Sequence, residues 1–115
     1  MINQIVIRER YLRDELPVRL GGLAANLARI KSFSDHPGHQ DLIGSLLEES
    51  KFFIEWTFAD TDLEDQAVLA ELQVQLALWQ RRWGKIWDDP VQRVVVAEKA
   101  HDWSKRVLEM SGILQ

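Results

Sequence analysis

A stripe of six large apolar residues limits what this chain can fold into more than any other feature. The residues recur at spacings of 3, 4, 3, 4 and 3, and they are Leu69, Leu72, Leu76, Trp79, Trp83 and Ile86. Because an α-helix turns once every 3.6 residues, this spacing places all six on one face. Such a narrow stripe is typical of the seam of a helical bundle. It predicts one long helix, whose buried face is widened by Ala70, Val74, Ala77 and Leu78.

Three other segments show the same helical recurrence. The first runs through Leu16, Leu20, Leu23, Leu27 and Ile30, the second through Ile43, Leu46, Leu47, Phe53, Ile54 and Phe58, and the last through Val96, Ala100, Trp103, Val107 and Met110. A chain of 115 residues suits one domain. We therefore predict an all-α fold, an antiparallel up-and-down four-helix bundle, that forms a single domain over residues 1–115.

Three short breaks separate the predicted helices, at residues 34–38, 59–62 and 88–90. Thr61 and Glu64 have the spacing of a capping box, in which each side chain satisfies a free N–H at a helix start. Asp89 before Pro90 indicates an N-cap followed by a proline in the first turn. Gly112 is the expected C-cap of the last helix.

Pro17 divides the first apolar segment. Upstream of it, Ile5 and Leu12 are expected to continue the buried stripe. A proline inside a helix removes one hydrogen bond and clashes with the preceding turn. The first helix is therefore either kinked at Pro17 or broken, with a short N-terminal element that ends near Glu15.

Composition excludes several classes of function. The net charge of −4 argues against nucleic-acid binding, because proteins that bind nucleic acids usually carry a basic surface. No apolar stretch approaches the roughly 20 residues of a membrane span, and the first 13 residues do not read as a secretory signal. The absence of cysteine fits a cytoplasmic protein. No phosphate-binding loop or cofactor fingerprint is present, so we expect no cofactor.

Two groups of residues are candidates for a protein interface. The small residues Gly21, Ala25 and Ala28 form a stripe that lets another helix approach closely, either within the bundle or from a second subunit. Among the five tryptophans, Trp56 and Trp87 lie off or beyond the main apolar stripes, so we expect them to be exposed. Exposed tryptophans often anchor protein contacts.

The histidines are the weak candidates for a metal site. His36 and His39 flank Pro37 and Gly38, with Asp35 and Asp41 near, but a metal site needs three or four ligands in fixed geometry. Solvated loop histidines are the simpler interpretation.

Glu98 and His101 form a Glu-x-x-His pair on one helical face. Di-iron carboxylate bundles use two such pairs, and this chain has one. Glu49, Glu55 or Glu71 would have to supply a further carboxylate. Our leading hypothesis is therefore a non-enzymatic helical module for protein interaction, with self-association as a homo-oligomer. The alternative is a ligand- or metal-binding bundle that uses Glu98 and His101.

Overall fold

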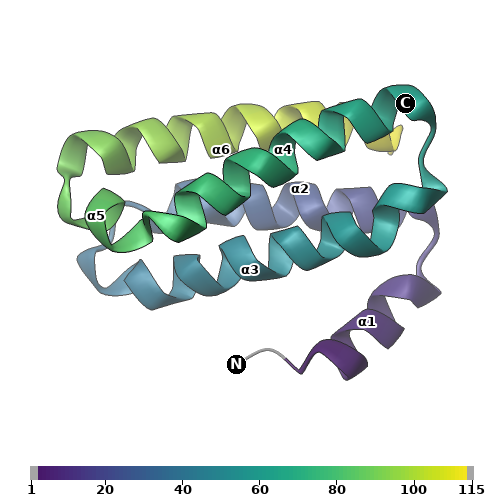
Figure 1. Cartoon of the computed structure of the whole chain (residues 1–115), viewed down its shortest axis with the longest axis horizontal. Coiled ribbons are helices and arrows are strands. Elements are labelled where there is room, and N and C mark those ends of the chain that lie inside the picture. Colours follow the sequence, from purple (N-terminus) through teal and green to yellow (C-terminus); the bar gives the residue numbers. More distant parts are fainter. Residues whose placement is uncertain (1–2, 114–115) are drawn as a thin grey trace.

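The computed structural model describes residues 3–113, and that part of the chain is all-helical, as predicted. It contains six α-helices rather than the four expected. They are α1 (Gln4–Arg13), α2 (Leu16–Phe33), α3 (Gln40–Thr57), α4 (Leu63–Arg81), α5 (Trp83–Asp88) and α6 (Pro90–Ser111). Two short 3₁₀ turns, η1 (Pro37–His39) and η2 (Phe58–Asp60), precede α3 and α4 respectively. The four long helices lie alongside one another, and α1 lies beside the others near α3 (Figure 1).

The first of the two additional helices arises at Pro17. Asp14 and Glu15 are extended, and α2 begins at Leu16 with Pro17 in its first turn, where the missing N–H costs no hydrogen bond. The chain is therefore broken rather than kinked before Pro17. The expectation that Ile5 and Leu12 continue the buried stripe is wrong, because both are exposed and Tyr11 is the buried residue of α1.

The second additional helix arises at Arg82, where the predicted third helix ends early. Arg82 leaves the helical conformation at φ −107° and ψ 13°, and α5 follows in a new direction. Two indole N–H groups hold α5 in place: Trp83 Nε1 donates to the carbonyl of Gln40 at 2.9 Å, and Trp87 Nε1 to that of Pro37 at 3.3 Å. These tertiary hydrogen bonds explain why the helix does not continue straight.

Capping residues define most of the helix ends. Asp89 caps α6 by accepting from the N–H of Val91, and Gly112 ends α6 in the left-handed conformation at φ 72°, both as predicted. The cap of α4 is Asp62, which accepts from the N–H of Asp65 at 2.8 Å. The predicted Thr61 capping box is wrong, because the Thr61 hydroxyl donates backwards to the carbonyl of Phe58.

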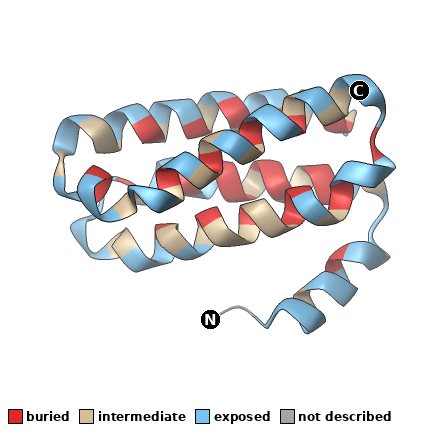
Figure 2. Ribbon diagram, in the orientation of Figure 1, coloured by how far each residue is buried: buried red, intermediate tan, exposed pale blue. Residues whose placement is uncertain are grey.

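The core lies between the long helices and is centred on α2 (Figure 2). Helix α2 packs against both α3 and α6, which explains the near-complete burial of Leu20, Leu23, Ala24, Leu27 and Ile30. From the predicted seam, Leu69, Leu72, Leu76, Trp79 and Ile86 are buried, whereas Trp83 is only half-buried. Val74 and Leu78 do not widen the buried face. They are 61% and 51% exposed on the opposite side of α4.

Candidate interaction surface

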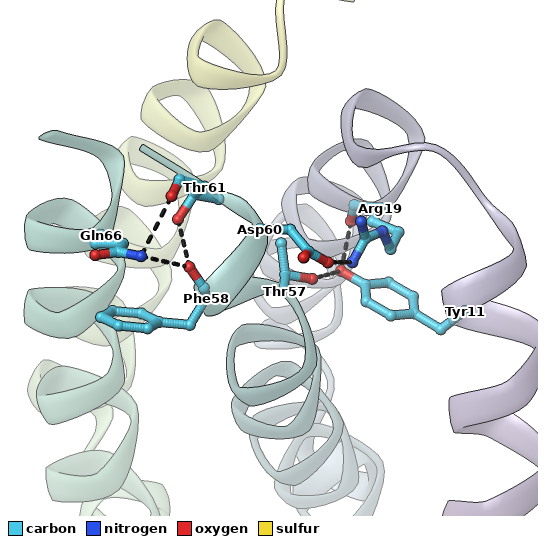
Figure 3. Close-up of polar contacts among 7 residues, drawn as sticks. All are labelled: Tyr11, Arg19, Thr57, Phe58, Asp60, Thr61 and Gln66. Carbon is cyan, nitrogen blue, oxygen red and sulfur yellow. Dashed lines mark hydrogen bonds and ion pairs between the residues drawn. The ribbon is translucent and has the colours of Figure 1, made fainter. Parts of the chain in front are cut away.

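A polar cluster that is buried except for Asp60 joins α1, α2, α3 and η2, and no residue pattern in the sequence predicted it (Figure 3). The Tyr11 hydroxyl donates to the carbonyl oxygen of Arg19 at 2.7 Å and accepts from the Thr57 hydroxyl at 3.1 Å. The Arg19 guanidinium, itself buried, pairs through Nη1 with Asp60 Oδ2 at 3.0 Å. Arg19 Nε has no hydrogen-bond partner among the described residues. No helical spacing or short motif in the sequence marks these four residues as a cluster.

Burial raises the pKa of Tyr11 to about 12, and the hydrogen bond from Thr57 and the charge of Arg19 only partly oppose it. The phenol is therefore protonated at neutral pH. Its ring stacks on Phe53, with ring centroids 4.0 Å apart and planes within 8°. With every polar atom of Tyr11 and Thr57 occupied by a neighbour, this cluster anchors α1 to the other helices and offers no reactive group.

The ring nitrogens of the two loop histidines contact backbone groups of nearby residues. His36 Nδ1 accepts from the Gly38 N–H at 3.0 Å and caps η1, and His39 Nδ1 lies 3.1 Å from the carbonyl of Phe33. Their rings stack at 4.4 Å between centroids. Among residues 3–113, no group of three His, Asp or Glu side chains could hold a metal ion together.

Glu98 and His101 are not brought together with a further carboxylate. Glu98 is exposed and lines an open cleft of about 370 Å³ between the end of α2 and the start of α6. Lys31, Asp35 and Arg93 also line this cleft, whereas His101 does not. Two of the three candidate carboxylates have partners elsewhere: Glu49 Oε1 accepts from the buried amide of Asn26 at 3.0 Å, and Glu71 lies 4.0 Å from Arg106. Glu55 lines the groove between α3 and α4.

The small residues of α2 face a neighbour within the chain. The Ser104 hydroxyl of α6 donates to the carbonyl of Ala24 at 2.7 Å, so the two helices cross closely along this stretch. A Cβ added at Gly21 would lie 3.2 Å from the Ile113 side chain. Ala25 and Ala28 are half-buried. At Gly21, the segment that comes close is therefore the chain's own C-terminal part.

The two tryptophan candidates differ in their environments. The expectation that Trp87 is exposed is wrong: the indole is buried, its N–H bonds to Pro37, and the guanidinium of Arg93 lies 5.1 Å from its ring centroid. Trp56 is half-buried and stacks on Phe52, with ring centroids 5.5 Å apart. The position of Trp87 at a helix end did not make it exposed, because α5 places the Trp87 indole against the η1 turn.

The solvent side of α4 presents a row of apolar residues. Five apolar residues at spacings of 4, 3, 4 and 4 are exposed there, and we call them the outer stripe: Leu63, Ala67, Ala70, Val74 and Leu78. Figure 2 shows the corresponding alternation of red and pale blue along α4. A helix that is apolar on two opposite faces is normally covered on both. The outer stripe is therefore an apolar surface that the described part of the chain leaves exposed to solvent.

Shallow grooves on both sides extend this apolar surface. The groove toward α3 is lined by Ile54, Phe58, Ala70 and Val74, together with Glu55 and Gln73. The groove toward α6 includes Leu78, Trp79, Val95 and Val96. Val91 and Val95, at the start of α6, are 72% and 43% exposed. A contiguous apolar region that spans two helices is typical of a protein contact surface.

Charged residues are segregated along α4. From its N-cap Asp62 to Leu72 the charged residues are all acidic, and from Gln73 through the end of α4 and into α5, as far as Trp87, they are all basic. The pKa of Asp65 is raised by burial and by the nearby carboxylates of Asp62 and Glu64. Negative charge is therefore crowded at one end of the outer stripe, and Arg81 and Arg82 lie at the other.

Comparisons with protein-family models, with curated proteins and with solved structures found no match to this chain. Within residues 3–113, no helix combines the length and apolar character that a membrane span requires.

Proposed function

We propose that this chain is a non-enzymatic module for protein interaction, which works in the cytoplasm and self-associates as a homo-oligomer. Its scaffold is an antiparallel up-and-down bundle of α2, α3, α4 and α6, with α1 and α5 as additions. Figure 1 supports this topology, since successive long helices run in opposite directions there. The absence of cysteine supports the location.

The single observation that carries the function is the outer stripe of α4. Leu63 is 84% exposed and Val74 61%, although both lie on a long helix whose other face is fully packed. Isolated exposed apolar residues are common on any protein, but a regular stripe that continues into two apolar grooves is not. Burying it against a protein would remove this surface from water.

A crosslinking experiment tests this function. A photoreactive Val74→p-benzoylphenylalanine variant, irradiated in the cells that make the protein, should form one dominant adduct that mass spectrometry identifies. The same residue placed at Leu42, an exposed position on α3 outside the outer stripe, is the matched control. The Val74 adduct should disappear when Leu78→Glu is added. Equal labelling at the two positions would overturn the function.

The cleft beside Glu98 supports a second candidate, the binding of a small ligand, and His101 lies outside its lining. The metal form of this candidate takes Glu98 and His101 as ligands. Lys31, Asp35, Arg93 and Glu98 all line this cleft, and none pairs with an opposite charge within 4.0 Å among the described residues. Titration calorimetry with Zn²⁺ tests the metal form. Heat that is lost in both Glu98→Gln and His101→Ala would establish it, and no heat with the parent protein would remove it.

A further inference from the structure

The outer stripe of α4 is asymmetric in size as well as in charge. After Leu63 at its start, the stripe presents small Ala67 and Ala70 beside acidic Glu64. Its second half presents the larger Val74 and Leu78 beside basic Arg82. Any partner that covers the stripe must therefore offer large residues and positive charge at one end, and small residues and negative charge at the other.

A second copy of the same helix meets this requirement in one orientation. If two α4 helices run antiparallel, Val74 and Leu78 of each copy lie opposite Ala70 and Ala67 of the other, with the two-fold axis near residue 72. A parallel arrangement would place leucine on leucine and carboxylate on carboxylate. Large-on-small packing is favourable, and like charges across an interface are unfavourable.

We propose that two copies of this chain form a symmetric dimer through antiparallel pairing of their α4 outer stripes. The proposal rests on the proposed interaction function and names its partner. An antiparallel pair related by a two-fold axis is an isologous interface, in which each contact occurs twice. The stripe from Leu63 to Leu78 is about 22 Å long at 1.5 Å per residue, enough for a full helix–helix contact.

Glu64 and Arg82 form the ionic end contacts of this dimer. Arg82 is the C-cap of α4, and its N–H still bonds to the carbonyl of Leu78 at 3.3 Å. It lies 18 residues after Glu64, which is five helical turns, so the two residues lie on the same side of α4. The two-fold axis keeps that side common to both copies, and Glu64 of each copy then faces Arg82 of the other. Both side chains are exposed, and neither has an ion-pair partner in the described part of the chain.

The flanking grooves extend the contact beyond two helices. Val95 and Leu78 line the same groove on the α6 side, and Val74 shares the other groove with Phe58. Side chains at the edge of the second copy's α4 would enter these grooves. The buried surface then includes parts of α3 and α6, which brings it toward the size of a stable interface rather than that of a bare helix pair.

Sedimentation equilibrium tests the dimer. We expect the parent at tens of micromolar to sediment at twice the monomer mass of 13.4 kDa. Leu78→Glu should raise the dissociation constant of the dimer by about a hundredfold or more, because it places a carboxylate in the apolar contact. Leu42→Glu, the same change at a leucine of similar exposure on α3, should change that constant by less than about twofold.

A charge exchange tests the antiparallel orientation. Glu64→Lys alone and Arg82→Glu alone should each weaken the dimer, by about tenfold, because like charges then meet at both ends. An equimolar mixture of the two variants should form a heterodimer with parent-like affinity. At one end, the new positive charge of Glu64→Lys faces the new negative charge of Arg82→Glu, and at the other end the native Glu64–Arg82 pair remains. Circular dichroism should show equal helix content in all variants, which separates association from folding.

The outcomes separate this proposal from the broader function. A parent that stays monomeric overturns the dimer, and so does a dimer that Leu78→Glu leaves intact or a mixture without rescue. In each of those cases the interaction function stands if the Val74 crosslink joins the chain to a different, identified protein. A crosslink between two copies that is lost in Leu78→Glu supports both.

Discussion

The hydroxyl of Tyr11 donates to the carbonyl oxygen of Arg19 at 2.7 Å, across the break between α1 and α2. This contact folds α1 back toward the rest of the molecule at the point where Pro17 would otherwise let the chain diverge. The Thr57 hydroxyl donates to the same phenol oxygen, so one side chain ties α1 to both α2 and α3.

Tyr11→Phe should destabilise the protein by about 1–3 kcal/mol. The substitution keeps the stacking surface against Phe53 but removes one donor and one acceptor from a buried site, which leaves the Thr57 hydroxyl without its partner. Urea unfolding monitored by circular dichroism measures the loss. A change below about 0.5 kcal/mol would mean that water replaces the phenol hydroxyl.

The stability of the protein should fall between about pH 10 and pH 12. Because the pKa of Tyr11 is raised to about 12 in the folded state, the folded protein holds its phenolic proton more tightly than the unfolded chain does. That stability is complete below the unfolded pKa of 10.0 and is lost as the pH rises through the folded pKa. Two pKa units correspond to about 2–3 kcal/mol.

Tyr11 is the only tyrosine, so phenolate absorbance near 295 nm reports its titration directly. The midpoint in the folded protein should lie well above 10. For the pH dependence of stability, Tyr11→Phe provides the baseline, because lysine titration in the same pH range is common to both proteins. A midpoint near 10 in protein that circular dichroism shows to be folded would contradict the burial of the phenol.

The same substitution should destabilise the protein much more on the buried face of α4 than on its exposed face. Leu76→Ala, at a fully buried position, should cost about 2–5 kcal/mol, because it opens a cavity in the core. Leu78→Ala, two residues away and 51% exposed, should cost less than about 1 kcal/mol in protein diluted below the range of self-association. Chemical denaturation at low concentration compares the pair, and equal losses would contradict the assignment of faces.

The apolar spacing in the sequence was sufficient to predict an all-helical chain with four long helical segments and most of the core. It failed where a tertiary contact decides the outcome. The 3, 4 pattern continues through Trp83 to Ile86, but the indole bonds to Gln40 and Pro37 end α4 at Arg82. The exposure of Trp87 was misjudged for the same reason. Position along one helix carries no information about a carbonyl group 50 residues earlier.

The candidate surface was missed for a different reason. Val74 and Leu78 lie close enough to the seam in sequence to pass as a wider buried face, and only the packing of α4 shows that they point outward. The Tyr11 cluster joins residues from 11 to 60, so no local motif marks it. In contrast, Asp89, Pro90 and Gly112 were predicted correctly, because caps depend on neighbours within four residues.

Acid should weaken the start of α6 through Asp89. Its pKa is lowered by the hydrogen bonds from the Gln92 side chain and the Val91 N–H, which favour the charged carboxylate. Because the folded pKa lies below the unfolded value of 3.8, this contribution is complete above that value and is lost as the pH falls through the folded pKa.

Asp89→Asn is the matched variant for that prediction, since the amide oxygen still caps the helix but does not titrate. The stability difference between parent and variant should be constant from about pH 7 to pH 5 and should shrink as the pH falls below about 4. A difference that stays constant down to the acid limit would mean that the charge of Asp89 contributes nothing to the cap.

Two glycines near the C-terminal third of the chain should respond to alanine with opposite signs. Gly112 ends α6 at φ 72°, where a Cβ is strained, so Gly112→Ala should destabilise the protein by about 1–2 kcal/mol. Gly84 lies within α5 at negative φ, and an added Cβ would meet nothing within 4 Å. Gly84→Ala should therefore stabilise the protein by about 0.5–1 kcal/mol, because alanine loses less backbone entropy on folding. Thermal and urea unfolding of the two variants beside the parent measures both effects. Destabilisation by Gly84→Ala would show that the turn at Arg82 needs a flexible residue two positions later.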